Sequence, residues 1–300
     1  MTIEEAKEFV ENYIENVDSV EEYLDVLKFL CDNTDETRYM MELGGYYYER
    51  KKFDLAEKYY LRAAELNNGY ANVCLGYIYY YGRVGQPDYK KAFEYYSKAM
   101  NDDYIEGVYK VADMYKKGLY VEKDVKKYEH IIGSAYAYIE NKASFEPYHS
   151  AEIYMRMGHI LEKDGNLNEA AKLYYRAMNR FDKRLAQNRF FGDISNMNWA
   201  INSFYHLCEV DYDDIGFYDM MYLLRRPCKI KFEDFDGNEY EIKSEFDFDE
   251  HPDAQEGDTS IFFNDKWYRS ILDFYNKCHI NGEHIIDIKD EFFNYKVVNE

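Results

Sequence analysis

Three residues near the C-terminal end of the sequence alternate like the ligands of a calcium ion. Asp234, Asp236 and Asn238 carry oxygen atoms of the kind that calcium binds. An EF-hand places its glycine after the third such ligand, whereas Gly237 falls between the second and the third. The dipeptide Asp236-Gly237 is instead typical of a tight hairpin turn. The pattern therefore predicts a turn and no calcium site.

A second group has the ligand types that zinc prefers. Cys278, His279 and His284 span the end of a predicted helix and the start of a predicted strand. No fourth ligand follows at a spacing that zinc sites use. The remaining histidines are scattered along the chain: His130, His149, His159, His206 and His251. We therefore expect neither a metal nor a cofactor.

The sequence also lacks the usual signatures of catalysis. Gly82 and Gly85 belong to a loop that no strand precedes, so they do not form a dinucleotide or phosphate loop. No serine nucleophile elbow and no kinase signature occurs. Carboxylate pairs are frequent, but 58 acidic residues create such pairs by default. We expect a protein that is not an enzyme, and an enzyme site within residues 228–300 remains as an alternative.

The most unusual chemistry in the sequence is aromatic. Residues 75–99, LGYIYYYGRVGQPDYKKAFEYYSKA, hold seven tyrosines and three glycines. Many of these residues recur at a spacing of 36, which indicates an internal repeat. The recurring pairs include Tyr79 and Tyr115, Gly82 and Gly118, Asp88 and Asp124, Ala56 and Ala92, Tyr60 and Tyr96, and Ala63 and Ala99.

The alternation of small and large side chains predicts closely packed helix pairs. A glycine or alanine leaves a hole on the surface of a helix, and a ring from the neighbouring helix can fill it. Helix axes can then approach to about 8–10 Å. Some of the tyrosines are therefore expected to plug glycine and alanine holes, with the hydroxyl reaching toward water or a carbonyl group.

At these residues the chain resembles the tetratricopeptide repeat family. The matching residues are Leu43-Gly44-x2-Tyr47 with Ala56-x3-Tyr60 and Ala63, and Met157-Gly158-x2-Leu161 with Ala170-x3-Tyr174 and Ala177. Residues 71–99 look like the longer SEL-one-like variant, and residues 107–133 look like a degenerate copy in which Tyr128 replaces the expected alanine. The resemblance implies a mainly α fold, an α-solenoid of four helix pairs over residues 38–180.

The resemblance also implies that the inner helix of each pair lines a concave groove. Helical spacing selects Arg38, Met41 and Tyr48 in the first pair; Tyr70, Val73, Tyr77, Tyr80 and Tyr81 in the second; Tyr109, Asp113 and Lys116 in the third; and Met155, His159 and Glu162 in the fourth. Tyr77 and Tyr81 are four residues apart, so they project together. Such rings give rigid contact area for a partner, although packing between the pairs would also explain them.

The ends of the chain are acidic. Residues 1–37 hold twelve acids and two bases, residues 227–300 hold nineteen acids and eight bases, and the middle is neutral, within a net charge of −21. Binding to nucleic acid needs a basic face and is therefore not expected. Five dispersed cysteines suit reduced thiols, and neither a signal peptide nor a membrane span is evident. We expect a cytoplasmic protein with a protein or peptide partner, including a basic one.

The predicted organisation has two parts. Residues 1–226 form a helical solenoid, with a capping helix pair at 1–37, the four repeats at 38–180 and further helices at 181–226. Residues 227–300 form a small α+β domain with a hairpin, an acidic loop at 247–258, a helix at 265–279 and further strands. The leading hypothesis is a scaffold that binds a peptide in a tyrosine-lined groove. The alternative is an acidic inhibitor or immunity-type protein that covers a basic partner.

Overall fold

The structure is a computed structural model that describes residues 1–12, 20–141, 148–187, 191–208, 216–246, 259–280, 282–285, 289 and 292–298. Its contacts divide the chain into two compact units, Met1–His149 (unit 1) and Ser150–Glu300 (unit 2). The predicted division at residue 227 coincides with the change from helices to strands inside unit 2. Its role as a domain boundary stays a prediction.

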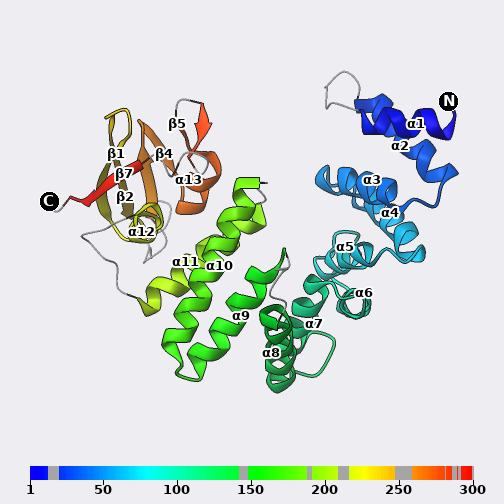
Figure 1. Ribbon diagram of the computed structural model, residues 1–300, viewed down its shortest axis with the longest axis horizontal. Helices are drawn as coiled ribbons and strands as arrows, with labels where there is room; N and C mark the ends of the chain where they lie inside the picture. Colours follow the sequence, from blue (N-terminus) through cyan, green and yellow to red (C-terminus); the bar gives the residue numbers. More distant parts are fainter. Residues whose placement is uncertain are drawn as a thin grey trace. The chain divides into compact units, whose positions relative to one another are not determined.

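Unit 1 is built from consecutive helices, each of which packs on the next from α3 to α8 (Figure 1). They are α1 (Ile3–Glu11), α2 (Val20–Asn33), α3 (Thr37–Glu49), α4 (Phe53–Glu65), α5 (Gly69–Tyr80), α6 (Tyr89–Asn101), α7 (Ile105–Lys117) and α8 (Val125–Asn141). Helix α1 begins with a capping box, in which Thr2 and Glu5 each accept the backbone N–H of the other. The predicted capping pair at residues 1–37 corresponds to α1 and α2, and residues 13–19 between them lie outside the described residues.

Glycines in the first helix of a pair receive tyrosine rings from the second helix, as the sequence predicts. A Cβ atom built on Gly44 would lie 2.5 Å from Tyr60 Cε1, one on Gly76 would lie 2.4 Å from Tyr96 Cε1, and one on Gly158 would lie 2.6 Å from Tyr174 Cε1. No real Cβ atom tolerates such distances, so each ring occupies the space that a side chain would need. The three rings are buried, with 0–4% of each exposed.

The longer loops of the second and third pairs share one geometry. Gly82 and Gly118 both adopt left-handed backbone angles, with φ of +60° and +70°. Each loop is closed by a backbone N–H that donates across it at 2.9 Å, from Asp88 to the Tyr79 carbonyl and from Asp124 to the Tyr115 carbonyl. Both aspartates also cap the following helix through their side chains. The 36-residue spacing is therefore a structural repeat.

The third pair fills the same space with different residues. Ala112 and Ile132 stand 36 positions after Gly76 and Tyr96, and both are fully buried. Tyr128, which replaces the expected alanine, is buried too. A larger residue at the glycine position is thus accompanied by a smaller one at the tyrosine position. The degenerate sequence of this pair keeps the packing by exchanging volume between its two helices.

Unit 2 begins with α9 (Ser150–Lys163), α10 (Leu167–Gln187), α11 (Phe191–Leu207) and α12 (Phe217–Leu223). The α9–α10 pair repeats the glycine–tyrosine packing through Gly158 and Tyr174. A buried charge cluster then joins α9, α10 and α11. The Arg184 guanidinium donates to both carboxylate oxygens of Glu152, at 3.0 and 2.9 Å, and to both oxygens of Asp193. All three side chains are at most 7% exposed.

The strands of unit 2 form a five-stranded antiparallel sheet in the order β4-β3-β2-β1-β7 (Figure 1). They are β1 (Cys228–Asp234), β2 (Glu239–Phe246), β3 (Thr259–Phe263), β4 (Lys266–Tyr268) and β7 (Phe292–Val297). One face buries Ile230, Phe232, Ile242, Ile261 and Phe263. The predicted fold class is confirmed: mainly α, with helix-pair repeats and a small C-terminal α+β region. The acidic segment 247–258 lies outside the described residues.

The expected helix at 265–279 is only partly correct. Residues 266–268 form the edge strand β4, and the helix α13 is limited to Ile271–Lys277. Ser270 caps α13 by accepting the N–H of Asp273, at 3.1 Å. The alternation of Trp267, which is exposed, with the buried Tyr268 is a strand pattern that apolar helical spacing concealed. A short hairpin of β5 (His279–Ile280) and β6 (Glu283–His284) follows.

Candidate functional site

Four tyrosines on and just after α5 form the surface that we name the tyrosine surface: Tyr70, Tyr77, Tyr80 and Tyr81. Asn68 starts the helix by accepting the N–H of Ala71, at 3.0 Å. Gly82, with its left-handed backbone, follows the last of the four tyrosines. Between these two ends, Tyr70, Tyr77 and Tyr81 share a helical stripe with Cys74, because the spacing is i, i+4, i+7 and i+11.

Three rings of the tyrosine surface contact one another, and the fourth, Tyr70, packs against Tyr104 at 6.0 Å. Tyr77 and Tyr81 are stacked, with ring centroids 6.1 Å apart and planes inclined by 7°. Tyr80 meets Tyr81 edge to face at 5.0 Å and meets Tyr89 in the same way at 5.5 Å. Tyr70 and Tyr81 nevertheless remain 45% and 49% exposed. The surface is therefore aromatic and accessible. Tyr77 and Tyr80 are held by ring contacts before any partner arrives, and Tyr81 is the most exposed of the four rings.

Three cations approach these rings. The Lys110 Nζ atom lies 4.5 Å from the ring centre of Tyr77, and the Arg83 guanidinium lies 5.3 Å from that of Tyr81. The Lys117 ammonium donates to the Tyr80 hydroxyl at 3.2 Å, which raises the pKa of Lys117. Lys110 and Lys117 belong to α7, so neighbouring pairs contribute to one surface.

The tyrosine hydroxyls are poorly solvated for groups so exposed. Desolvation raises the pKa values of both Tyr70 and Tyr81. Lys117 and Arg83 act in the opposite direction on Tyr81, because a nearby cation favours the phenolate.

The structure distributes the predicted groove residues unevenly. Tyr77 and Tyr109 share a hydrogen bond between their hydroxyls, at 3.4 Å, although Tyr109 is only 4% exposed. Tyr48 is half-buried against Phe53, and its hydroxyl acts electrostatically on that of Tyr81. Lys116 points elsewhere, with its Nζ atom 4.9 Å from the ring centre of Tyr128.

The remaining predicted groove residues differ widely in exposure. Val73 and Met155 are buried in the core, whereas Met41 and Asp113 are half-buried. Arg38 is exposed and pairs with Glu36 at 3.0 Å. In unit 2, His159 is exposed and lies 4.0 Å from Glu162, which is half-buried.

The sequence held a signal for the cations that helical spacing missed. Adding 36 to the stripe positions 70, 74, 77 and 81 gives Glu106, Lys110, Asp113 and Lys117. The sequence analysis selected Tyr109 and Lys116 on α7, each one residue before the stripe residues Lys110 and Lys117. The repeat spacing is therefore a better guide to the face of α7 than its own apolar pattern.

The residues with ligand chemistry have other roles in the structure. Asp234 accepts the backbone N–H groups of Asp236 and Asn238, at 3.0 and 2.9 Å, and the Tyr240 hydroxyl at 2.9 Å, so it holds the predicted hairpin turn. His279 and His284 face each other across the β5–β6 pair. Among the described residues, no cluster of three or more His, Cys, Asp or Glu side chains could hold a metal.

The cysteine thiols are poor nucleophiles where they stand. Burial raises the pKa of Cys31 and of Cys278 to about 11 and that of Cys74 to about 12. The pKa values of Cys208 and Cys228 are raised for the same reason. All five are free thiols. Within the described ranges, no helix combines the length and the apolar character that a membrane crossing requires.

Comparison with known proteins identifies the repeats. The sequence pattern of the Sel1 repeat matches residues 38–68, 70–103 and 105–127, which cover α3 to the start of α8. The resemblance to the SEL-one-like variant is therefore confirmed, and this part of the chain consists of Sel1 repeats. The pair α9–α10 lies outside the matched residues. Sel1-repeat proteins are generally protein-interaction scaffolds and are typically not catalytic.

Several solved structures are similar to the chain at low identity. The protective antigen c5321 of uropathogenic Escherichia coli, which displays an SLR fold, is 16% identical, with a TM-score of 0.43 over 61% of this chain and 41% of that one. A Sel1 repeat protein from Oxalobacter formigenes is 18% identical, with a TM-score of 0.45 over 59% and 66%. The type IV pilus biogenesis factor PilW is 16% identical, with a TM-score of 0.35 over 62% and 81%.

The chain thus spans less than two thirds of the length of the first two structures. No curated protein matches the sequence.

Proposed function

We propose that the protein is a non-catalytic scaffold that binds a protein or peptide on its tyrosine surface. The observation that carries the proposal is the stacked pair Tyr77 and Tyr81, in which Tyr77 is half-buried and Tyr81 is 49% exposed. Tyrosine gives a large contact area and loses little conformational entropy on binding. Rings already fixed by their neighbours lose less still, so more of the contact energy appears as affinity.

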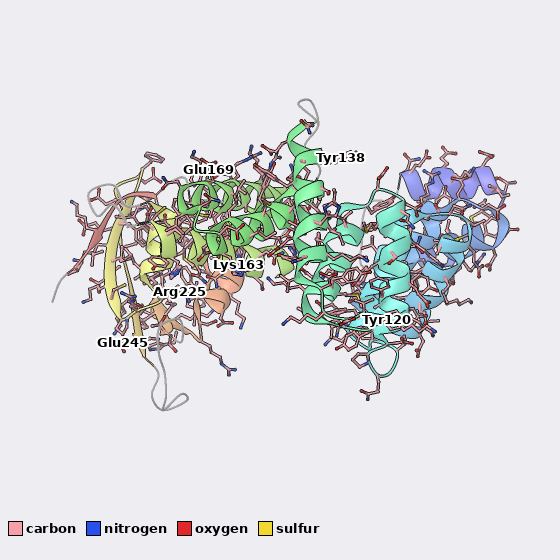
Figure 2. All side chains as sticks on the ribbon, turned by 90° about the horizontal axis from the view of Figure 1, so that it is seen from below. Tyr120, Tyr138, Lys163, Glu169, Arg225 and Glu245 are labelled. Carbon is pink, nitrogen blue, oxygen red and sulfur yellow. The ribbon has the colours of Figure 1, made fainter. Side chains whose placement is uncertain are left out.

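The test is a selection of peptides from a random library displayed on phage. The full-length protein should enrich a set of related peptides, and the Tyr77→Ala/Tyr81→Ala variant should not, because the central rings of the surface are gone. A matched control removes two exposed tyrosines elsewhere, Tyr138 on α8 and Tyr175 on α10. Figure 2 shows Tyr138 at the surface of unit 1.

Circular dichroism and thermal unfolding should show that both double variants keep their helices. Enrichment that survives in the Tyr77→Ala/Tyr81→Ala variant, or that fails in the control, would reject this surface as the binding site. We place the protein in the cytoplasm, which its free thiols support, and we expect no nucleic-acid partner because the net charge is −21.

The second candidate is an acidic inhibitor that covers a basic protein. Its support is the excess of ten acids in residues 1–37 and of eleven in residues 227–300. Association steered by charge slows steeply as salt is added. Salt-sensitive association with a basic protein that persists in the Tyr77→Ala/Tyr81→Ala variant would favour this candidate over the first. An enzyme site within 228–300 has less support, since Asp234 there serves the hairpin.

A further inference from the structure

The tyrosines that fill the glycine holes differ in what their hydroxyls contact. The Tyr60 hydroxyl interacts with the Cys74 thiol, which contributes to its raised pKa, and the Tyr174 hydroxyl donates to Glu162 at 2.6 Å. Tyr96 is fully buried, yet its hydroxyl has no hydrogen-bond partner among the described residues. Only the pair that carries the tyrosine surface leaves this group unsatisfied, and a buried polar group without a partner is unfavourable.

The Tyr96 hydroxyl lies beneath the tyrosine surface. The Tyr96 ring passes over Gly76 and meets Tyr77 edge to face at 5.9 Å and Tyr80 at 6.5 Å. Tyr77, Tyr81 and Tyr80 are also the groups that act most strongly on its hydroxyl after desolvation. An acceptor brought in by a partner would therefore meet this donor at the base of the surface.

Two cations stand beside the same rings without a carboxylate. Arg83 and Lys117 are exposed, and neither forms an ion pair within 4.0 Å among the residues that the structure describes. Asp113 acts on Lys117 only at longer range.

From these observations we infer that the tyrosine surface takes an acidic segment of a partner protein, with one carboxylate held between Lys117 and Arg83 against Tyr81. This inference rests on the proposed function and names the chemistry of its partner. The cations donate to the carboxylate, and the methylene groups of the same side chain pack on the Tyr81 ring. A rotation of the exposed Tyr81 ring, common for interface side chains, gives the carboxylate access to the Tyr96 hydroxyl.

The same phage-displayed library tests the inference. Peptides enriched by the full-length protein should be rich in Asp and Glu relative to the input library. A synthetic peptide of the enriched sequence, labelled with a fluorophore, should bind roughly tenfold more weakly to the Arg83→Glu/Lys117→Glu variant, because like charges then meet. The control Lys90→Glu/Lys126→Glu changes the net charge equally, at exposed lysines near the starts of α6 and α8, and should keep the affinity.

The hydroxyl has its own matched pair of variants. Tyr96→Phe should weaken binding of the labelled peptide roughly threefold, as expected for one lost hydrogen bond. Tyr60→Phe should leave the affinity unchanged. Equal affinities in these two variants would remove Tyr96 from the site.

Enriched peptides without an excess of acidic residues, or an unchanged affinity in the Arg83→Glu/Lys117→Glu variant, would overturn the acidic partner and leave the proposed function standing. A library that yields no peptide dependent on Tyr77 and Tyr81 would overturn the proposed function, and the acidic partner with it.

Discussion

The α5–α6 and α9–α10 pairs follow one packing rule and differ in how they use their polar groups. In both, a tyrosine from the second helix fills the space over a glycine of the first. In α9–α10 the polar atoms are satisfied from within, by Glu162 for Tyr174 and by Arg184 for Glu152. In α5–α6 the Tyr96 hydroxyl has no hydrogen-bond partner within the described ranges of the chain. The difference separates residues that hold a pair together from residues available to a ligand.

The largest loss of stability is expected from the removal of Arg184 in the α9–α10 pair. Arg184→Ala leaves Glu152 and Asp193 buried without a cation, so the free energy of unfolding should fall by about 3–5 kcal/mol. Urea unfolding followed by circular dichroism measures it. Lys117→Ala, on the tyrosine surface, should change stability by less than about 0.5 kcal/mol. Similar losses in the two variants would show that the cations do not differ in role.

A larger residue in place of Gly76 should be tolerated better when the facing Tyr96 is made smaller. Gly76→Ala puts a methyl group against Tyr96 and should reduce stability by about 1–3 kcal/mol. Adding Tyr96→Ile reproduces the combination of Ala112 and Ile132 in the third pair, so the double variant should be more stable than the sum of its single variants predicts. A double-mutant cycle of unfolding free energies checks this, and additive effects would contradict it.

Removal of single hydroxyls gives a finer contrast. Tyr174→Phe breaks the hydrogen bond to Glu162 and should reduce stability by about 1–2 kcal/mol. Tyr96→Phe removes a buried hydroxyl that has no partner, so stability should stay level or rise. Thermal unfolding of the two variants, measured side by side, is sufficient to compare their stabilities. A loss in Tyr96→Phe as large as in Tyr174→Phe would mean that the Tyr96 hydroxyl is satisfied in the free protein.

The smallest effect is expected from pH. In the folded chain the pKa of Cys74 is raised to about 12, whereas an unfolded cysteine titrates near 8.5. Folding stability that depends on this thiol is therefore complete below about pH 8.5 and is lost as the pH rises. Unfolding free energies measured between neutral pH and pH 10 should fall less steeply in Cys74→Ala. Identical slopes would show that the thiol ionises equally in both states.

The helix pairs were predictable because their packing depends on side-chain size at fixed spacing. Gly158 and Tyr174 follow Gly44 and Tyr60 at an interval of 114 residues, and Tyr96 follows Tyr60 at an interval of 36. Gly76 could be read from the match of residues 71–99 to the SEL-one-like pattern. The hairpin turn at Asp236-Gly237 was equally local. The edge strand β4 was mistaken for helix because three residues are too few to show a period.

The site was less accessible to prediction from the sequence. Which tyrosines stay exposed depends on the neighbouring pair, since Tyr109 of α7 is buried and shares a hydrogen bond with Tyr77 of α5, whereas Tyr81 is 49% exposed. The cations Arg83 and Lys117 meet the rings only after the loop and α7 have folded back onto α5. The missing partner of the Tyr96 hydroxyl depends on every neighbour of that atom, so no local pattern could reveal it.

The contact between Gly76 and Tyr96 also constrains how such a chain can evolve. A methyl group added at residue 76 while the ring is present is destabilising, whereas the ring can be replaced by a smaller side chain without a clash while the glycine remains. A lineage that moves from the glycine–tyrosine combination to that of Ala112 and Ile132 avoids the clash when it changes the aromatic codon first. The reverse path avoids it when the methyl group is lost before the ring is regained. The order of the two substitutions therefore decides whether the intermediate sequence carries the clash.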